Sequence, residues 1–440
     1  MIKTLTSAFK NKDIRKKLLY TLMMLVVIRI GSLLPIPGVD TEYFSTLLSG
    51  FNSGDLSYLS AFTGGSFEKM SLFALSITPY ITSSIIMQLL TIAIPKLEEM
   101  QKEGEDGRKK IASITRYVTI ALALIESIAM AVGFGRQGLI KDYKDMSTIH
   151  YVTCIIVVVA ALTAGSAVLM WIGERITEKG VGNGISIVLL INIISGMPSD
   201  FVTLYSTFVA NKSIARGVTV AVIIAAIVIA VVVLVVILQD GERRIPGQYS
   251  QKVAGRKTIG GQATNIPLKV NTAGVMPIIF ASSIMQFPVI IVQLFTSNSY
   301  EWTKYLSQSY WCRVQMPKYS IGLLLYIILV VVFAYFYTSI TFNPVQIADN
   351  LKKAGGVVPG ITPGRSTSEY LNKILNYIVF IGAVGLMIVA LIPIMCTGFF
   401  NASVSFGGTS IIIIVGVVLE TLKQIEAQMC NRYYKGFLSE

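Results

Sequence analysis

The chain has few charged residues and a single histidine. Charged residues make up 14% of its 440 positions, whereas hydrophobic residues make up 53%. A soluble chain of this length would form two or three domains with a far more charged surface. His150 alone cannot build a histidine-based metal site. The four cysteines are scattered without a Cys-x-x-Cys pair, which indicates neither a disulfide framework nor a metal centre.

Phosphate-binding glycine loops are also missing. The glycine-bearing stretches at 181–184 and 260–261 lack the lysine pattern of a P-loop. We therefore expect no enzyme activity and no cofactor. Any work that the chain performs must draw its energy from a partner.

Long hydrophobic runs dominate the sequence instead. A helix needs about 20 mostly apolar residues to cross a bilayer, and a run such as VTVAVIIAAIVIAVVVLVVIL (218–238) has no plausible place in a soluble core. The first run is too long for a signal peptide and lacks a cleavage site, so we interpret it as a retained helix. The predicted spans are 19–36, 70–94, 114–134, 151–172, 185–205, 217–238, 273–295, 319–341, 374–395 and 409–427.

Lysine and arginine collect on one side of these spans. Most of the 37 basic residues lie in the N-terminal tail, the loops after even-numbered spans and the C-terminal tail. The positive-inside rule then places both termini in the cytoplasm of a multi-pass protein of the cell membrane. The formal net charge of +13 is concentrated at this face, which suits anionic lipid, an acidic partner or a nucleic acid.

One apolar segment occurs twice. ITPYITSSIIMQLL begins at residue 77 and VMPIIFASSIMQFP at residue 275, 198 positions later, and the first and sixth spans have the same offset. A weaker repeat links GISI (184–187) with GTSI (408–411). Two halves of five helices must lie in opposite orientations because five is odd. Such an inverted repeat places the working site between the halves, near the bilayer midplane.

The repeat also sets the expected organisation of the chain. The predicted parts are a cytoplasmic tail (1–18), an N-terminal half (19–210), a C-terminal half (211–427) with cytoplasmic loops at 239–272 and 342–373, and a second cytoplasmic tail (428–440).

Inverted repeats are common in secondary transporters, so an ion-coupled transporter is an alternative. A solute site usually leaves ionisable groups within the spans. Here they are Arg29, Glu126 and Glu420, and Glu420 lies at the cytoplasmic edge. Arg29 is explained equally well by a structural pairing and Glu126 by bonds to hydroxyls of a neighbouring helix. No charged relay crosses the membrane, and a membrane-assembly scaffold is a third possibility.

Aliphatic residues occupy equivalent places in the repeats: Ile81 with Ile279, and Leu189 with Ile413. An inverted two-fold axis would bring them to one depth as a collar that seals by fit and dewetting. Ordinary helix packing explains any one of them, and it is their pairing that favours a collar. The short segment 56–65, ended by two glycines, is either a surface helix or a half-helix that enters the vestibule.

Six blocks of the sequence resemble the SecY family, the pore subunits of bacterial protein-translocation channels. They follow in order over nearly the whole chain: FTGGSFEKMSLFALSITPYITSSIIMQLL (62–90), GEDGRKKIASITRY (104–117), GERITEKGVGNGISIVLL (173–190), ERRIPGQYSQKVAGRKTIGGQATNIPLKVNTAGVMPIIFASSI (242–284), FNPVQIADNLKKAGGVVPGITPG (342–364) and FGGTSIIIIVGVVLETLKQIE (406–426).

The resemblance implies an all-α clamshell of ten transmembrane helices, hinged between the fifth and sixth, with a short plug half-helix at about 55–69. The implied pore ring is Ile77, Ile81, Leu189, Ile279 and Ile413. The implied plug includes Leu56, Leu59, Phe62, Gly64 and Gly65. The implied lateral gate includes Thr82, Ile85, Ile86, Glu126, Ser282, Ser283, Gln286 and Phe287. The sequence leaves open whether Thr82 and Glu126 bond to each other.

The resemblance also implies partners: SecE and SecG as subunits, the SecA motor, the ribosome through its RNA phosphates, signal sequences and nascent chains, with SecDF, YidC and lipids around them. A solvated positive-inside loop explains the same basic residues without a partner. The implied docking residues are Arg243, Arg244, Lys252, Arg256, Lys257, Lys352, Lys353 and Arg365. Two positions depart from the family: Thr362 stands where most bacterial members have arginine, and Glu126 where glutamine is frequent.

Overall fold

Ten long helices follow the ten predicted spans. The computed structural model describes residues 9–50, 63–135, 139–140, 147–208, 214–249, 252–254, 257–259, 263–295, 300–312, 316–400 and 408–436. The long helices in this part are α2 (Lys12–Leu33), α5 (Thr78–Ala93), α7 (Glu105–Phe134), α8 (Thr148–Lys179), α9 (Gly184–Phe208), α10 (Ile214–Asp240), α11 (Met276–Phe295), α13 (Ile321–Thr341), α15 (Arg365–Phe400) and α16 (Gly408–Gly436).

Five of the described helices are long and apolar enough to cross a membrane by themselves. They lie within α7, α8, α10, α13 with its flanking segments, and α15, and a bent pair formed by α5 and α6 (Pro95–Lys102) is a sixth candidate. The apolar stretches of α9 and α11 are shorter, Gly184–Ser199 and Met276–Val289. The protein is therefore a mostly helical, multi-pass membrane protein.

The second span differs from its prediction. A helix over 70–94 was expected, but α5 begins only at Thr78, and residues 64–77 form turns in which Met70 and Ser76 have positive φ. Pro79 explains the start, because a proline inside a helix loses one hydrogen bond and clashes with the carbonyl four residues earlier. Pro277 occupies the same second position of α11. The two copies of the repeat therefore begin their helices alike.

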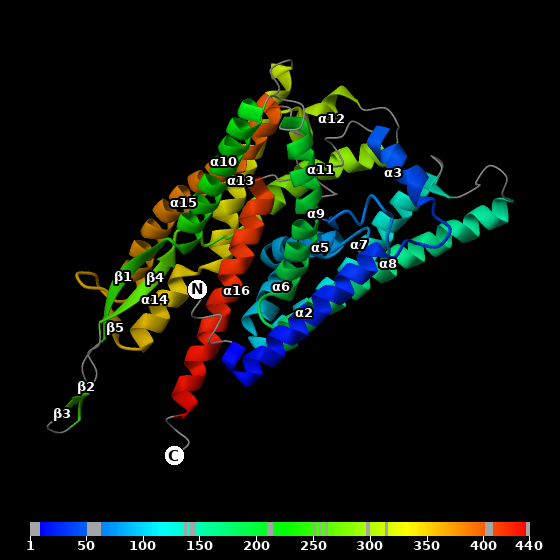
Figure 1. The fold of residues 1–440 in the computed structure, drawn as a ribbon. Helices are drawn as coiled ribbons and strands as arrows, with labels where there is room; N and C mark the ends of the chain where they lie inside the picture. Colours follow the sequence, from blue (N-terminus) through cyan, green and yellow to red (C-terminus); the bar gives the residue numbers. More distant parts are fainter. Residues whose placement is uncertain are drawn as a thin grey trace.

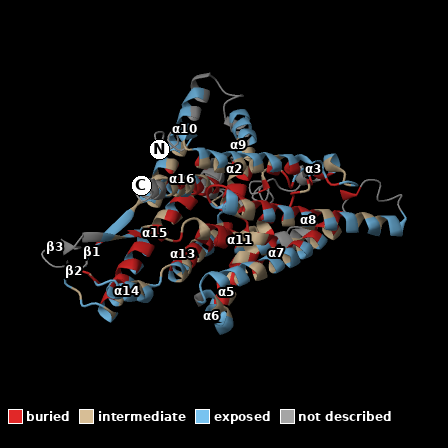
Figure 2. Ribbon diagram, turned by 90° about the horizontal axis from the view of Figure 1, so that it is seen from below, coloured by how far each residue is buried: buried red, intermediate tan, exposed pale blue. Residues whose placement is uncertain are grey.

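The chain order groups the helices into two halves (Figure 1). In the N-terminal half α7 packs between α5 and α8, and α8 also contacts α2 and α9. In the C-terminal half α13 packs between α11 and α15, while α15 contacts α10 and α16. The halves meet where α9 contacts α10 and α16 and where α11 contacts α7. Buried residues concentrate in the middle of this arrangement and exposed ones at its outer surfaces and projecting ends (Figure 2).

The two loops predicted on the cytoplasmic side contain strands. β1 (Glu242–Tyr249) pairs antiparallel with β4 (Ala263–Lys269) and with β5 (Gly356–Val357) from the other loop. A hairpin of β2 (Lys252–Ala254) and β3 (Lys257–Ile259) extends beyond it. The sheet lies against α14 (Pro344–Lys353) and α15, and its apolar contacts include Ile245, Leu268, Leu351, Val358 and Leu371. The two basic loops thus form one folded unit.

Short elements lie at the opposite end of the bundle. They are α3 (Thr41–Gly50), α12 (Glu301–Leu306) and two 3-10 turns, Gln308–Tyr310 and Pro317–Ser320. Trp311 is fully buried among them and donates its indole N–H to the carbonyl of Tyr305 at 2.8 Å. This loop also reaches α11, since the Gln308 amide donates to the Ser282 hydroxyl at 3.3 Å.

Candidate pore and gate

The five predicted ring residues all lie in or against the apolar core that the two halves share, and their arrangement as a ring stays a prediction. Ile77, Leu189, Ile279 and Ile413 are 1%, 6%, 4% and 1% exposed, and all belong to a single cluster of buried side chains. Ile81 is half-buried and packs against that cluster. Ile81 is on α5 and Ile77 directly precedes that helix, while the other three residues are on α9, α11 and α16. An aliphatic cluster of this kind excludes water and offers no ligand to a polar solute.

The described part of the predicted plug forms turns. Leu56, Leu59 and Phe62 lie outside the described residues. Gly64 and Gly65 have φ of +62° and +79°, which other residues adopt only with strain. A Cβ on Gly64 would lie 2.5 Å from the Ser195 hydroxyl and 2.6 Å from the Asn192 carbonyl, whereas one on Gly65 would meet nothing within 4 Å. The backbone at Gly64 is therefore in direct contact with α9.

The predicted gate residues of the N-terminal half lie on α5 and α7. Ile85 is buried, Ile86 is half-buried, and the Thr82 hydroxyl donates within its own helix to the Thr78 carbonyl at 3.1 Å. Glu126 is half-buried and has no hydrogen bond or ion pair among the residues that the structure describes. Thr82 and Glu126 therefore do not bond to each other in this structure.

The predicted gate residues of the C-terminal half lie on α11. Ser282 and Gln286 are 0% and 3% exposed. They are four positions apart and so lie on the same face of the helix. Ser283 is half-buried, and Phe287 is exposed at 54%. The helix thus buries a polar pair on one side and presents an aromatic ring on another.

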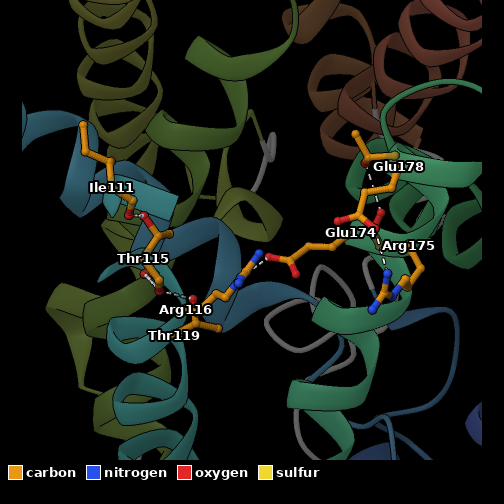
Figure 3. Close-up of polar contacts among 10 residues, drawn as sticks. Ile111, Thr115, Arg116, Thr119, Glu174, Arg175 and Glu178 are labelled. Atoms are coloured by element: carbon orange, nitrogen blue, oxygen red, sulfur yellow. Dashed lines mark hydrogen bonds and ion pairs between the residues drawn. The ribbon is translucent and has the colours of Figure 1, made fainter. Parts of the chain in front are cut away.

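The seam is the contact between α7 and α11, where the two halves meet. Polar bonds connect the helices on its N-terminal side, and Figure 3 shows two of them. Arg116 on α7 pairs with Glu174 on α8 at 2.6 Å between Nε and Oε1, and Arg175 pairs with Glu178 at 2.8 Å within α8. The Ser83 hydroxyl on α5 donates to the Thr115 carbonyl on α7 at 2.9 Å. These bonds connect α5, α7 and α8. The pair of Arg116 and Glu174 was not predicted, because its members are 58 residues apart and no sequence pattern relates them.

The seam itself has no such bonds. Among the residues that the structure describes, no side-chain hydrogen bond or ion pair joins α5 or α7 to α11 or α13. Within the described residues, no directional side-chain bond therefore holds α7 to α11, although these helices are in contact. Separating these helices breaks no side-chain hydrogen bond or ion pair among the described residues, and an apolar helix or lipid can replace the lost apolar contacts.

Those predicted docking residues that the structure describes lie on or next to the folded unit that the two basic loops form. Arg243 and Arg244 are on β1, and Lys352 and Lys353 are exposed in the last turn of α14, so pairing of β1 with β5 brings the two basic loops together. Lys252 and Lys257 are on β2 and β3. Arg256 lies outside the described residues.

Local bonds occupy two members of this basic region. Arg244 pairs with Glu242 at 2.7 Å, and Arg365 pairs with Glu369 one helical turn later at 3.0 Å. The Thr362 hydroxyl donates to the Ser366 hydroxyl at 2.9 Å. Thr362 lies just before α15, and Ser366 is in its first turn. Exposed pairs of this kind contribute little stability and are easily exchanged for a partner's charges.

Comparison with known proteins gives consistent relatives. The SecY family model matches residues 71–422. The chain is 41% identical, over 447 aligned positions and the full length of both proteins, to the protein translocase subunit SecY of Halalkalibacterium halodurans.

Solved structures share the fold. One solved structure is of a SecY protein whose plug domain is described as stabilising the closed channel and maintaining a membrane seal. It has a TM-score of 0.61 at 17% identity, and the match covers 94% of this chain and 92% of that one. Canine Sec61 in a ribosome-channel complex has a TM-score of 0.59 at 18% identity, with the same coverage. The family match covers most of the chain and the curated relative all of it, so the chain belongs to the SecY family.

Proposed function

We propose that this protein is the gated channel subunit of a protein translocase. It passes unfolded polypeptides across the cytoplasmic membrane and releases transmembrane segments sideways into lipid. The observation that carries the proposal is the apolar cluster that unites Ile77, Leu189, Ile279 and Ile413 from both halves. Relatives named as protein translocase subunits, identical at 41% over the full length, support it.

The cluster suits a seal that must fit many polypeptides. Aliphatic side chains adapt to a passing chain without bonding to it, and a dry constriction resists ions when no chain is present. An apolar ring also stabilises no single substrate, so a polypeptide is not held on its way through.

The contact between α7 and α11, in which the described residues form no side-chain hydrogen bond or ion pair, suits a lateral gate. A signal sequence is an apolar helix, and its insertion replaces apolar contacts with apolar contacts at little net cost. The walls keep their shape because bonds such as Arg116 to Glu174 and Ser83 to Thr115 lie within the N-terminal half. In this proposal the hinge lies where α9 contacts α10.

The energy comes from partners that dock on the cytoplasmic unit, with the N- and C-termini on the same side of the membrane. The basic residues of β1 and α14 suit ribosomal RNA phosphates and the SecA motor. SecE and SecG complete the channel in this proposal. The ribosome-bound canine Sec61 structure supports the ribosome as a partner.

The decisive experiment is a conductance measurement in planar bilayers on the purified chain and on a variant lacking residues 57–66. The channel proposal expects a closed unmodified protein and a conducting variant. A transporter would instead accumulate a small solute in liposomes, and an assembly scaffold would conduct in neither form. Absence of conductance from the deletion variant would refute the channel.

A further inference from the structure

Arg29 is a cation within the predicted first span. It lies near the outer end of α2 (Lys12–Leu33), and no carboxylate pairs with it among the described residues. Its Nη1 donates to the Ser195 hydroxyl on α9 at 2.8 Å. A charged residue in a membrane segment is costly and is usually retained for a role, so the group that it contacts matters.

The Ser195 hydroxyl contacts both Arg29 and the segment before α5, residues 63–77. Because the oxygen accepts from Arg29, its single hydrogen is available for an acceptor. Two carbonyls are within reach, that of Asn192 in the same helix at 2.8 Å and that of Gly64 at 3.3 Å. Arg29, Ser195 and Gly64 thus connect α2, α9 and the turns at 63–77.

A second bond holds the other end of the same segment. The Asn192 side-chain amide donates to the Ser76 hydroxyl at 2.9 Å, and both residues are buried, at 3% and 1% exposed. Ser76 directly precedes the ring residue Ile77. Leu189, another ring residue, lies three positions before Asn192 on α9. The position of the segment and the position of the ring are therefore linked through α9.

We propose that Arg29 and Ser195 form a latch that holds the plug-bearing segment against α9 in the closed channel. This proposal rests on the channel function above and assigns Arg29 a positioning role. A charged donor polarises the hydroxyl and strengthens the bond that the hydroxyl makes in turn. Movement of the segment would take the Gly64 carbonyl away from this donor, whereas the Ser195 hydroxyl would keep the Asn192 carbonyl as an acceptor.

The test measures single-channel conductance in planar bilayers for Arg29→Met, Ser195→Ala, the double variant and Arg29→Lys. The bond that reaches the segment joins a neutral hydroxyl and a carbonyl, so its loss should raise the ratio of open to closed channels about two- to tenfold. The double variant should conduct no more than the stronger single variant because both remove the same connection. Arg29→Lys, which keeps the charge, should restore part of the closure. Arg175→Met, an arginine of α8 with its own partner Glu178, is the matched control and should remain closed.

The deletion of residues 57–66 separates the two proposals. If the deletion conducts while Arg29→Met and Ser195→Ala stay closed, the latch is refuted and the channel stands. If the two single effects multiply in the double variant, the connection is also refuted. If the deletion does not conduct, the channel fails and the latch with it. Should Arg29→Met not insert, the comparison of Ser195→Ala with the unmodified protein decides alone.

Discussion

Replacement of Ile413 by asparagine tests the apolar seal most directly. Ile413 is 1% exposed and lies in the cluster that contains Ile77, Leu189 and Ile279. Asparagine is polar and has less apolar surface than isoleucine. In the closed channel its amide would therefore be buried among aliphatic side chains without a partner. In an open, wetted pore the same amide would be hydrated. The substitution therefore penalises only the closed state.

The size of the penalty follows from the burial. An amide placed in an apolar site without a hydrogen bond costs about 1–3 kcal/mol by mutational data. Loss of the aliphatic side chain from a fully buried place adds about 1.5–3 kcal/mol. The lost apolar burial shifts the equilibrium only as far as this side chain is less buried in the open channel than in the closed one. The expected effect is therefore calculated from the cost of the buried amide alone. This cost raises the ratio of open to closed channels on the order of five- to a hundredfold.

The assay is ion conductance in planar bilayers, combined with export of a precursor whose signal sequence is defective. Ile413→Asn should leak ions and let the defective precursor pass. Val418→Asn is the matched control on the same helix, because Val418 is 41% exposed and outside the cluster. Equal conductance of the two variants, or an Ile413→Asn channel as tight and as selective as the unmodified one, would refute the seal.

Two further predictions concern the gate and the docking surface. Cysteines at Thr82 and Phe287, in a chain without its native cysteines, should crosslink on oxidation and stop export. Continued export through a crosslinked channel would exclude a gate at this seam. Among the native thiols to be replaced, burial raises the pKa of Cys312 and slows its oxidation. Arg243→Glu combined with Arg244→Glu should weaken ribosome binding about tenfold or more and flatten its dependence on salt. Binding that keeps its full salt dependence would show that the phosphates contact other residues.

The ten helices were predictable because each carries a long apolar run, and the repeat predicted the pairs Ile81 with Ile279 and Leu189 with Ile413. All four residues lie in or against the large apolar core, which also contains residues such as Trp311 and Val330, so their pairing at one depth stays a prediction. The late start of α5 was missed, since hydrophobicity over 70–94 does not distinguish a helix from apolar turns. Pro79 was the available signal, and the equivalent Pro277 at the start of α11 strengthens it.

The sheet formed by the two basic loops was missed for a different reason. β5 is only two residues long, and it becomes a strand because β1, over a hundred residues earlier, offers its edge. Non-local pairing of this kind leaves no periodicity in the sequence. The same holds for the contacts of Arg29 with Ser195 and of Arg116 with Glu174, whose members lie far apart in the chain. Arg29 could be noted as a cation in a span, but its partner required the fold.

The distribution of polar bonds differs between the helices of the N-terminal half and the contact that we propose as the gate. Hydrogen bonds and ion pairs join α5, α7 and α8, and they join α2 and α9 to the turns before α5. In the described residues none crosses from α5 or α7 to α11 or α13. A directional bond across this seam would resist opening and would have to be remade at each closure, whereas apolar packing can be exchanged with any apolar helix. Polar substitutions that create a bond between α7 and α11 should therefore slow a translocase more than equally large changes at the lipid-facing side.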